Sequence, residues 1–113
     1  MKTMMAILRI ADIKKEYIEL RDRKSELESE YIKLERLHTC AFKDRCLAAK
    51  YGDRTAWQGL AVIAQEYEDQ LRTIGGKIGL IQLEMHALAH DYTVLVTRHK
   101  LIESMDYPYH IYD

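Results

Sequence analysis

The segment KYGDRTAW, residues 50–57, is the strongest turn signal in the chain and decides the fold. Glycine readily takes the left-handed conformation just past a helix end, so Gly52 marks the end of one helix. The side chain of Asp53 can accept a hydrogen bond from the first free N–H groups of the next helix. The segment therefore predicts two helices that are joined at residues 51–54 and, because the connection is short, lie antiparallel.

On the N-terminal side of this turn, apolar residues recur at alternating spacings of three and four, the pattern of a helix that packs against another helix. Near Cys40 two phases compete, one through Leu47 and Tyr51 and one through His38 and Ala48, so we expect a stutter or bend there. The stripe consists of Ile10, Ile13, Tyr17, Leu20, Lys24, Leu27, Tyr31, Leu34, His38 and Ala41.

On the C-terminal side, a longer stripe keeps its phase over 14 positions, and only His99 among them is clearly polar. Its members are Trp57, Leu60, Ala64, Tyr67, Leu71, Ile74, Ile78, Ile81, Met85, Leu88, Tyr92, Leu95, His99 and Ile102. With five glycines and one proline in 113 residues, turn formers are scarce, which favours an all-α fold. We expect one hairpin domain over residues 1–104, with helices over about 4–50 and 55–103.

Three glycines interrupt the second helix at Gly75, Gly76 and Gly79. Glycine inside a helix costs roughly 1 kcal/mol relative to alanine, so together they oppose a continuous helix by roughly 3 kcal/mol. The spacing from Ile74 to Ile78 nevertheless keeps the stripe in phase, whereas a turn would normally reset it. A continuous or kinked helix is favoured, and a break at Gly75–Gly76 that gives three helices remains the alternative.

A second stripe begins at these glycines on another side of the same helix. A helix that is apolar on two sides has to be buried on two sides, so we expect contact with a second chain and assembly into an oligomeric helical bundle. Glycine at the edge of this stripe would let a partner backbone approach closely. The stripe consists of Gly76, Leu80, Leu83, Ala87, His90, Val94, Thr97 and Leu101.

The charge pattern limits the classes of partner. The net charge of −1 gives no field that would gather nucleic acid or an anionic membrane. Residues 1–50 carry a net +3 and residues 51–113 a net −4, which suits two helices lying side by side. No stretch approaches the ~20 apolar residues of a membrane span. Cys40 and Cys46 match no disulfide or zinc spacing, so we expect reduced thiols and a cytoplasmic location.

Few residues point to chemistry. His86 and His90, four apart, would place two imidazoles on one helical face as metal ligands require, but no third ligand accompanies them at a diagnostic spacing. Lys24, His38 and His99 occupy stripe positions, where polar residues usually fix register or oligomer number. No catalytic, phosphate-binding or dinucleotide-binding motif is present, so we expect neither an enzyme nor a cofactor.

The C-terminal tail, residues 105–113, is dense in aromatic side chains around Pro108, which cannot continue a helix. Tyr107, Tyr109 and Tyr112 combine an apolar ring with a polar tip, which suits an interface. The tail is therefore expected to fold back on the helices or to dock on another subunit, and a motif that binds a different protein is the alternative.

Together these patterns predict a small self-associating helical adaptor or inhibitor that binds a partner protein without catalysis. Motif-free helical chains of this size are common among phage accessory proteins, which is an expectation about class. The runner-up is an oligomeric sponge that holds a small nucleotide-like anion at subunit junctions lined by Gly75, Gly76 or Gly79. A metal-dependent enzyme or sensor that uses His86 and His90 is the third hypothesis.

Overall fold

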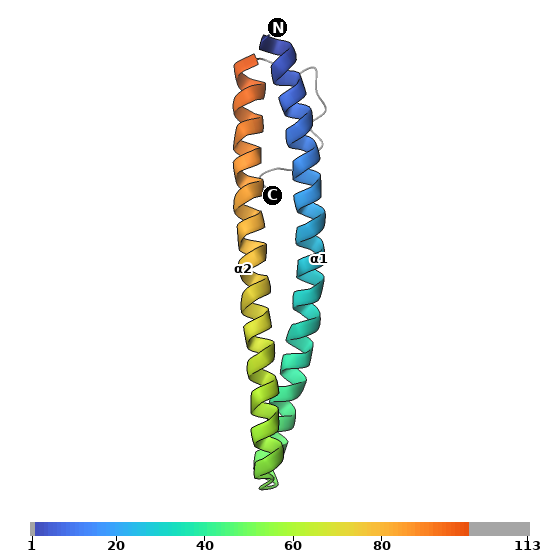
Figure 1. The fold of residues 1–113 in the computed structure, drawn as a ribbon, viewed down its shortest axis with the longest axis vertical. Coiled ribbons are helices and arrows are strands. Elements are labelled where there is room, and N and C mark those ends of the chain that lie inside the picture. The colour runs from blue at the N-terminus through green and yellow to red at the C-terminus, as the bar shows by residue number, and fades with distance from the viewer. Residues whose placement is uncertain (1, 100–113) are drawn as a thin grey trace. The chain divides into compact units, whose positions relative to one another are not determined.

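The computed structural model describes residues 2–99, which form two helices and one tight turn. Helix α1 spans Lys2–Lys50 and helix α2 spans Arg54–His99 (Figure 1). No strand occurs within residues 2–99, so the predicted all-α class is confirmed for this part of the chain. Helix α2 begins at Arg54, one residue earlier than the sequence pattern indicates, and the aromatic tail lies outside the described residues.

The turn between the helices is built as residues 50–57 predict. Gly52 has a φ of 72°, the left-handed conformation. The N–H groups of Gly52 and Asp53 donate to the carbonyl oxygens of Ala49 and Ala48, at 3.2 and 2.9 Å, and so close the last turn of α1 in a Schellman motif. Asp53 also caps α2, because its Oδ1 accepts a hydrogen bond of 3.0 Å from the N–H of Ala56.

The chain packs as two units, and both helices contribute to each of them. The first unit combines residues 1–24 with residues 80–113, of which residues 2–24 and 80–99 are described. The second unit is residues 25–79 and includes the turn.

The second unit is an antiparallel helical hairpin. The ring of Tyr31 lies beside Gly75, and His38 Nε2 lies 3.2 Å from Glu68 Oε1. Seven residues forward along α1 therefore correspond to seven residues back along α2. The buried apolar residues all belong to the predicted stripes or to their continuation, and they are Leu27, Ala41, Ala48 and Ala64.

Around Cys40 the structure settles which of the two competing phases continues. Helix α1 is unbroken, and Ala48 is buried, whereas Leu47 and Tyr51 are exposed. The stripe runs from Ala41 through Arg45 to Ala48 without a stutter. The guanidinium of Arg45, a residue that the apolar pattern did not include, lies 5.2 Å from the centroid of the Phe42 ring and 5.8 Å from that of Trp57. A cation–π contact thus occupies this stripe position.

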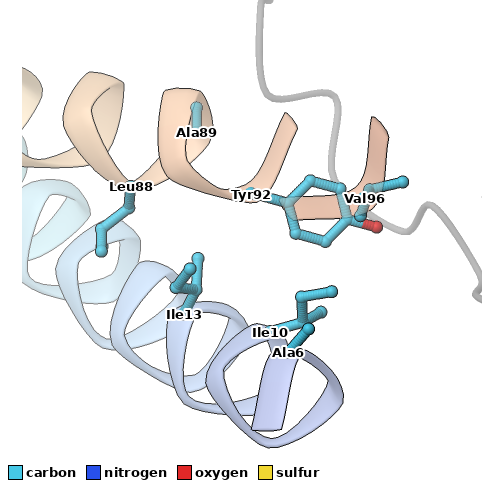
Figure 2. Close-up of a cluster of buried hydrophobic side chains, with 7 residues drawn as sticks. All are labelled: Ala6, Ile10, Ile13, Leu88, Ala89, Tyr92 and Val96. Atoms are coloured by element: carbon cyan, nitrogen blue, oxygen red, sulfur yellow. The ribbon is translucent and has the colours of Figure 1, made fainter. Parts of the chain in front are cut away.

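The first unit has its own hydrophobic core, which is shown in Figure 2. Ile10 and Ile13 of α1 point toward the side chains of Leu88 and Tyr92 of α2. Ile10 is completely buried, and Tyr92 is 1% exposed. Ile10, Ile13, Leu88 and Tyr92 belong to the predicted stripes, whereas toward the end of α2 the buried side also includes Ala89 and Val96, and the predicted Leu95 is only half-buried. The remaining members of this core are Ala6, Ala89 and Val96.

Helix α2 runs through Gly75, Gly76 and Gly79 without a break (Figure 1). Of the two alternatives that the sequence left open, the structure has the continuous helix. A Cβ atom added at Gly75 would lie 3.7 Å from Cε2 of Tyr31, an ordinary contact. At Gly76 or Gly79 it would meet no atom of residues 2–99 within 4 Å beyond the backbone of the helix itself. The packing of residues 2–99 therefore does not require glycine at any of the three positions.

Candidate interaction surface on α2

The candidate site is the second apolar stripe of α2, which we call the outward stripe. It comprises Gly76, Leu80, Leu83, Ala87, His90, Val94 and Thr97. Two residues along an α-helix correspond to a rotation of about 200°, so Leu83 points away from Ile81 and Met85, which face α1. The outward stripe is consequently on the side of α2 that α1 does not cover.

Exposure follows from this geometry. The side chains of Ile81 and Met85 are half-buried, whereas Leu80 is 63% exposed and Leu83 is 67% exposed. Val94 is half-buried, and Gly76, Ala87, His90 and Thr97 are exposed. Within residues 2–99 nothing covers the stripe that the sequence places at an interface, and two large, exposed leucines lie at its centre.

A row of charged residues borders the outward stripe along one side. Lys77, Glu84, Asp91 and Arg98 recur every seven residues and are all exposed. None of the four forms an ion pair with another residue in the range 2–99. Charged residues at such flanking positions select the partner and the orientation in helix–helix pairing. Along the row the signs are plus, minus, minus, plus, from Lys77 to Arg98. When two copies of α2 pair, the alignment of one copy against the other therefore decides whether like or opposite charges meet.

A second group of exposed apolar residues lies at the start of α1, before the first residue of the predicted stripe. It consists of Met4, Met5, Ile7 and Leu8, which are between 45% and 70% exposed. The signal was present in the unbroken apolar run of residues 4–8, since a helix that buries only one face cannot bury every residue of such a run.

The proposed metal ligands do not form a site in the described part of the chain. His86 and His90 are both exposed. No group of three or more His, Cys, Asp or Glu side chains within residues 2–99 is arranged to hold a metal ion. Two imidazoles alone leave most of the coordination sphere of a zinc ion to solvent. Cys40 and Cys46 are exposed and free.

The polar residues of the α1-facing stripes have structural surroundings. The side chain of His38 is 27% exposed, and its contact with Glu68 gives this partly buried ring a polar partner. Lys24 and His99 are half-buried. Such placement fits the structural role that the sequence predicts for them, the setting of helix register.

An anion-binding junction at the glycines would need nearby cations. A shallow hollow of about 260 Å³ just before Gly75 is lined by Asp69, Gln70, Thr73 and Ile74, so its charged group is a carboxylate. Cationic side chains gather instead in the first unit, where Arg9, Arg98 and His99 line a hollow of about 530 Å³ together with Met5, Ala6 and Leu95. The exposed Lys77, next to Gly76, is the cation beside the glycines, whereas the first unit brings two arginines together in one hollow.

Three predicted interface residues, Tyr107, Tyr109 and Tyr112, lie outside the described residues. Within residues 2–99, neither helix has a segment that is both long and apolar enough to cross a membrane. Comparison with known proteins found no matching family model, curated protein or solved structure. The outward stripe is therefore the feature of the described residues that points to a function.

Proposed function

We propose that this chain is a helical interaction module that acts by non-covalent binding and self-associates through the outward stripe of α2. The observation that carries the proposal is the exposure of Leu80 and Leu83, at 63% and 67%, on the face of α2 opposite its packed stripe. Exposed apolar residues are common singly, but a row at helical spacing is the signature of a helix-binding face. The role of adaptor or inhibitor for another protein belongs to the same proposal.

The energetics favour a reversible assembly. Burying the exposed two-thirds of a leucine side chain contributes about 1–2 kcal/mol, so the four leucines of a pair of chains contribute roughly 4–8 kcal/mol. Association costs at least about 4 kcal/mol in lost translational and rotational freedom. Ala87 and the flanking charges add a smaller contribution. The sum corresponds to weak, reversible self-association, with a dissociation constant between about micromolar (about −8 kcal/mol) and about millimolar (about −4 kcal/mol).

Analytical ultracentrifugation of the purified chain tests the proposal. At high micromolar concentrations the wild type should show a mass above that of one chain, and the Leu80→Glu/Leu83→Glu variant should sediment as a monomer. Both substitutions are on the solvent side of α2, and glutamate is a good helix former, so the circular dichroism of the variant should remain helical.

Val62→Glu is the matched control. Val62 is on the same helix and is 60% exposed, but it is followed on its own face by the acidic Glu66 and Asp69 rather than by leucines. It should leave the mass of the wild type unchanged. A wild-type chain that remains a monomer at the highest concentration tested would contradict the proposal.

A further inference from the structure

We infer that residues 76–87 of the outward stripe pack on the same residues of a second copy, running antiparallel in one particular register. This inference rests on the proposed function and adds the partner, the orientation and the alignment. Two features of α2 carry it, namely the position of its two exposed leucines and the signs of the charges beside them.

The leucines set the register. In an antiparallel pair with a two-fold axis at the level of Ile81 and Gln82, Leu80 of each copy packs on the partner's Leu83. This places the two most exposed apolar side chains of the outward stripe at the centre of the interface, where water is best excluded. A two-fold arrangement uses the same patch on both copies, so this interface closes on itself and does not propagate into a filament.

The same register places small residues on both sides of the leucines. Gly76 faces the partner's Ala87 on one side of the axis, and Ala87 faces the partner's Gly76 on the other. Beyond the backbone of its own helix, no atom of residues 2–99 lies within 4 Å of a Cβ added at Gly76, so these residues leave space there for a neighbouring helix. A glycine opposite an alanine lets two helices approach closely, which gives this position the function that its own chain does not require.

The charges favour this register over its neighbours. Flanking positions on the same side of an antiparallel pair face one another, so Lys77 meets the partner's Glu84, and by symmetry this pair occurs twice. Sliding one copy by seven residues in one direction brings Lys77 against the partner's Lys77. A slide of seven residues in the other direction brings Lys77 to the partner's Asp91. However, Glu84 then meets the partner's Glu84, and the leucines no longer face one another. A further seven residues in that same direction bring like charges together, with Glu84 opposite the partner's Asp91 and Lys77 opposite the partner's Arg98.

A parallel, in-register pair uses the charges less well. It aligns Leu80 with the partner's Leu80 and His90 with the partner's His90. In a parallel pair, a flanking residue on one helix contacts the residue five positions further along the partner. Within residues 76–98 this rule brings a carboxylate to a basic side chain only where His86 meets the partner's Asp91. Lys77 and Glu84 stay unpaired across such an interface, so the antiparallel register is the better match.

Charge reversal measured by sedimentation tests the register. Lys77→Glu and Glu84→Lys should each convert two attractive pairs into two repulsive ones and weaken dimerisation by about tenfold. The double variant Lys77→Glu/Glu84→Lys exchanges the signs and should restore the wild-type dissociation constant.

Asp91→Lys is the control for these reversals. Asp91 is on the same side of α2 one heptad away, but in this register it faces the partner's neutral Gln70, so its reversal should have little effect. A loss of dimerisation as large as that of Glu84→Lys would indicate the neighbouring register, in which Asp91 meets Lys77, and would overturn the inferred alignment.

A distance measurement tests the orientation independently. Spin labels are attached at position 65 of a Gln65→Cys chain in which Cys40 and Cys46 are changed to Ser. The two labels should lie about 50 Å apart along an antiparallel pair, from a rise of about 1.5 Å per residue. A parallel pair would bring them within roughly 20 Å.

The two failures are distinguishable. If Leu80→Glu/Leu83→Glu abolishes association but the labels are close, or the double charge reversal fails to restore dimerisation, the antiparallel register is wrong and the interaction function stands. If the wild type is a monomer, both are wrong. If the labels are distant and the double reversal restores dimerisation, the inference is supported.

Discussion

Gly52 and Asp53 show how two adjacent side chains fix a connection between long helices. Gly52 supplies a left-handed backbone that costs other residues free energy, and Asp53 ends α1 with its N–H group while its carboxylate begins α2. Both roles depend only on neighbouring backbone, which explains why the sequence alone was sufficient to predict them.

Gly52→Ala should lower the free energy of unfolding by about 1–2 kcal/mol, because the left-handed conformation crowds an alanine Cβ against the backbone. Gly59→Ala is the matched control. Gly59 is inside α2, with nothing within 4 Å of an added Cβ, so alanine should raise the stability by roughly 0.5–1 kcal/mol. Urea unfolding followed by circular dichroism measures both, and equal effects of the two substitutions would contradict the left-handed turn.

Other residue-scale features depend on the register between the helices and were not predictable from local pattern. The contact of His38 with Glu68 and the placement of Tyr31 beside Gly75 each join residues more than 25 positions apart in the sequence. Arg45 is a further case. The Arg45 side chain occupies a position on the packed side of α1, where its guanidinium lies over the rings of Phe42 and Trp57. A pattern of apolar residues does not include an arginine, so the pattern did not predict this contact.

At the scale of the helix, the spacing of the apolar residues predicted the continuity of α2 better than the low helix propensity of its glycines. Three glycines oppose helix formation by roughly 3 kcal/mol, yet α2 is continuous because Leu71, Ile74 and Ile78 keep packing on the same side. The apolar spacing predicted this continuity, although it left a break open. The outward stripe was also predicted from spacing, but its exposure required the position of α1.

Gly76→Ala in the Leu80→Glu/Leu83→Glu background should raise the free energy of unfolding of the monomer by roughly 0.5–1 kcal/mol. Among residues 2–99 an added Cβ meets no atom within 4 Å beyond the backbone of its own helix, so the helix-propensity gain decides the sign. Chemical denaturation measures it. A loss of stability would mean that the backbone at Gly76 departs from the helical conformation in solution.

At the scale of the whole chain, the sequence defines surfaces more clearly than it defines partners. The stripes that face α1 are satisfied within the chain, and the outward stripe is not. A periodic pattern identifies a helix-binding face because burial depends on side-chain type and spacing. It does not identify the molecule that binds there, since leucine packs equally well against many apolar surfaces.

The thermal midpoint should depend on protein concentration if assembly through the outward stripe stabilises the folded chain. Association removes folded monomer from the unfolding equilibrium, so the Tm of the wild type should rise as concentration increases. The Tm of the Leu80→Glu/Leu83→Glu variant should be constant. Differential scanning calorimetry over a wide concentration range compares them, and an unchanging wild-type Tm would argue against stabilisation by self-association.

The separation of the two apolar stripes on α2 has a consequence for redesign and for natural variation. Residues that hold the hairpin together and residues that face outward occupy different sides of one helix, so the latter can change without loss of the scaffold. A few substitutions at solvent-facing positions would be enough to change which molecule this chain binds. Related chains can therefore diverge in binding specificity while they keep the same hairpin.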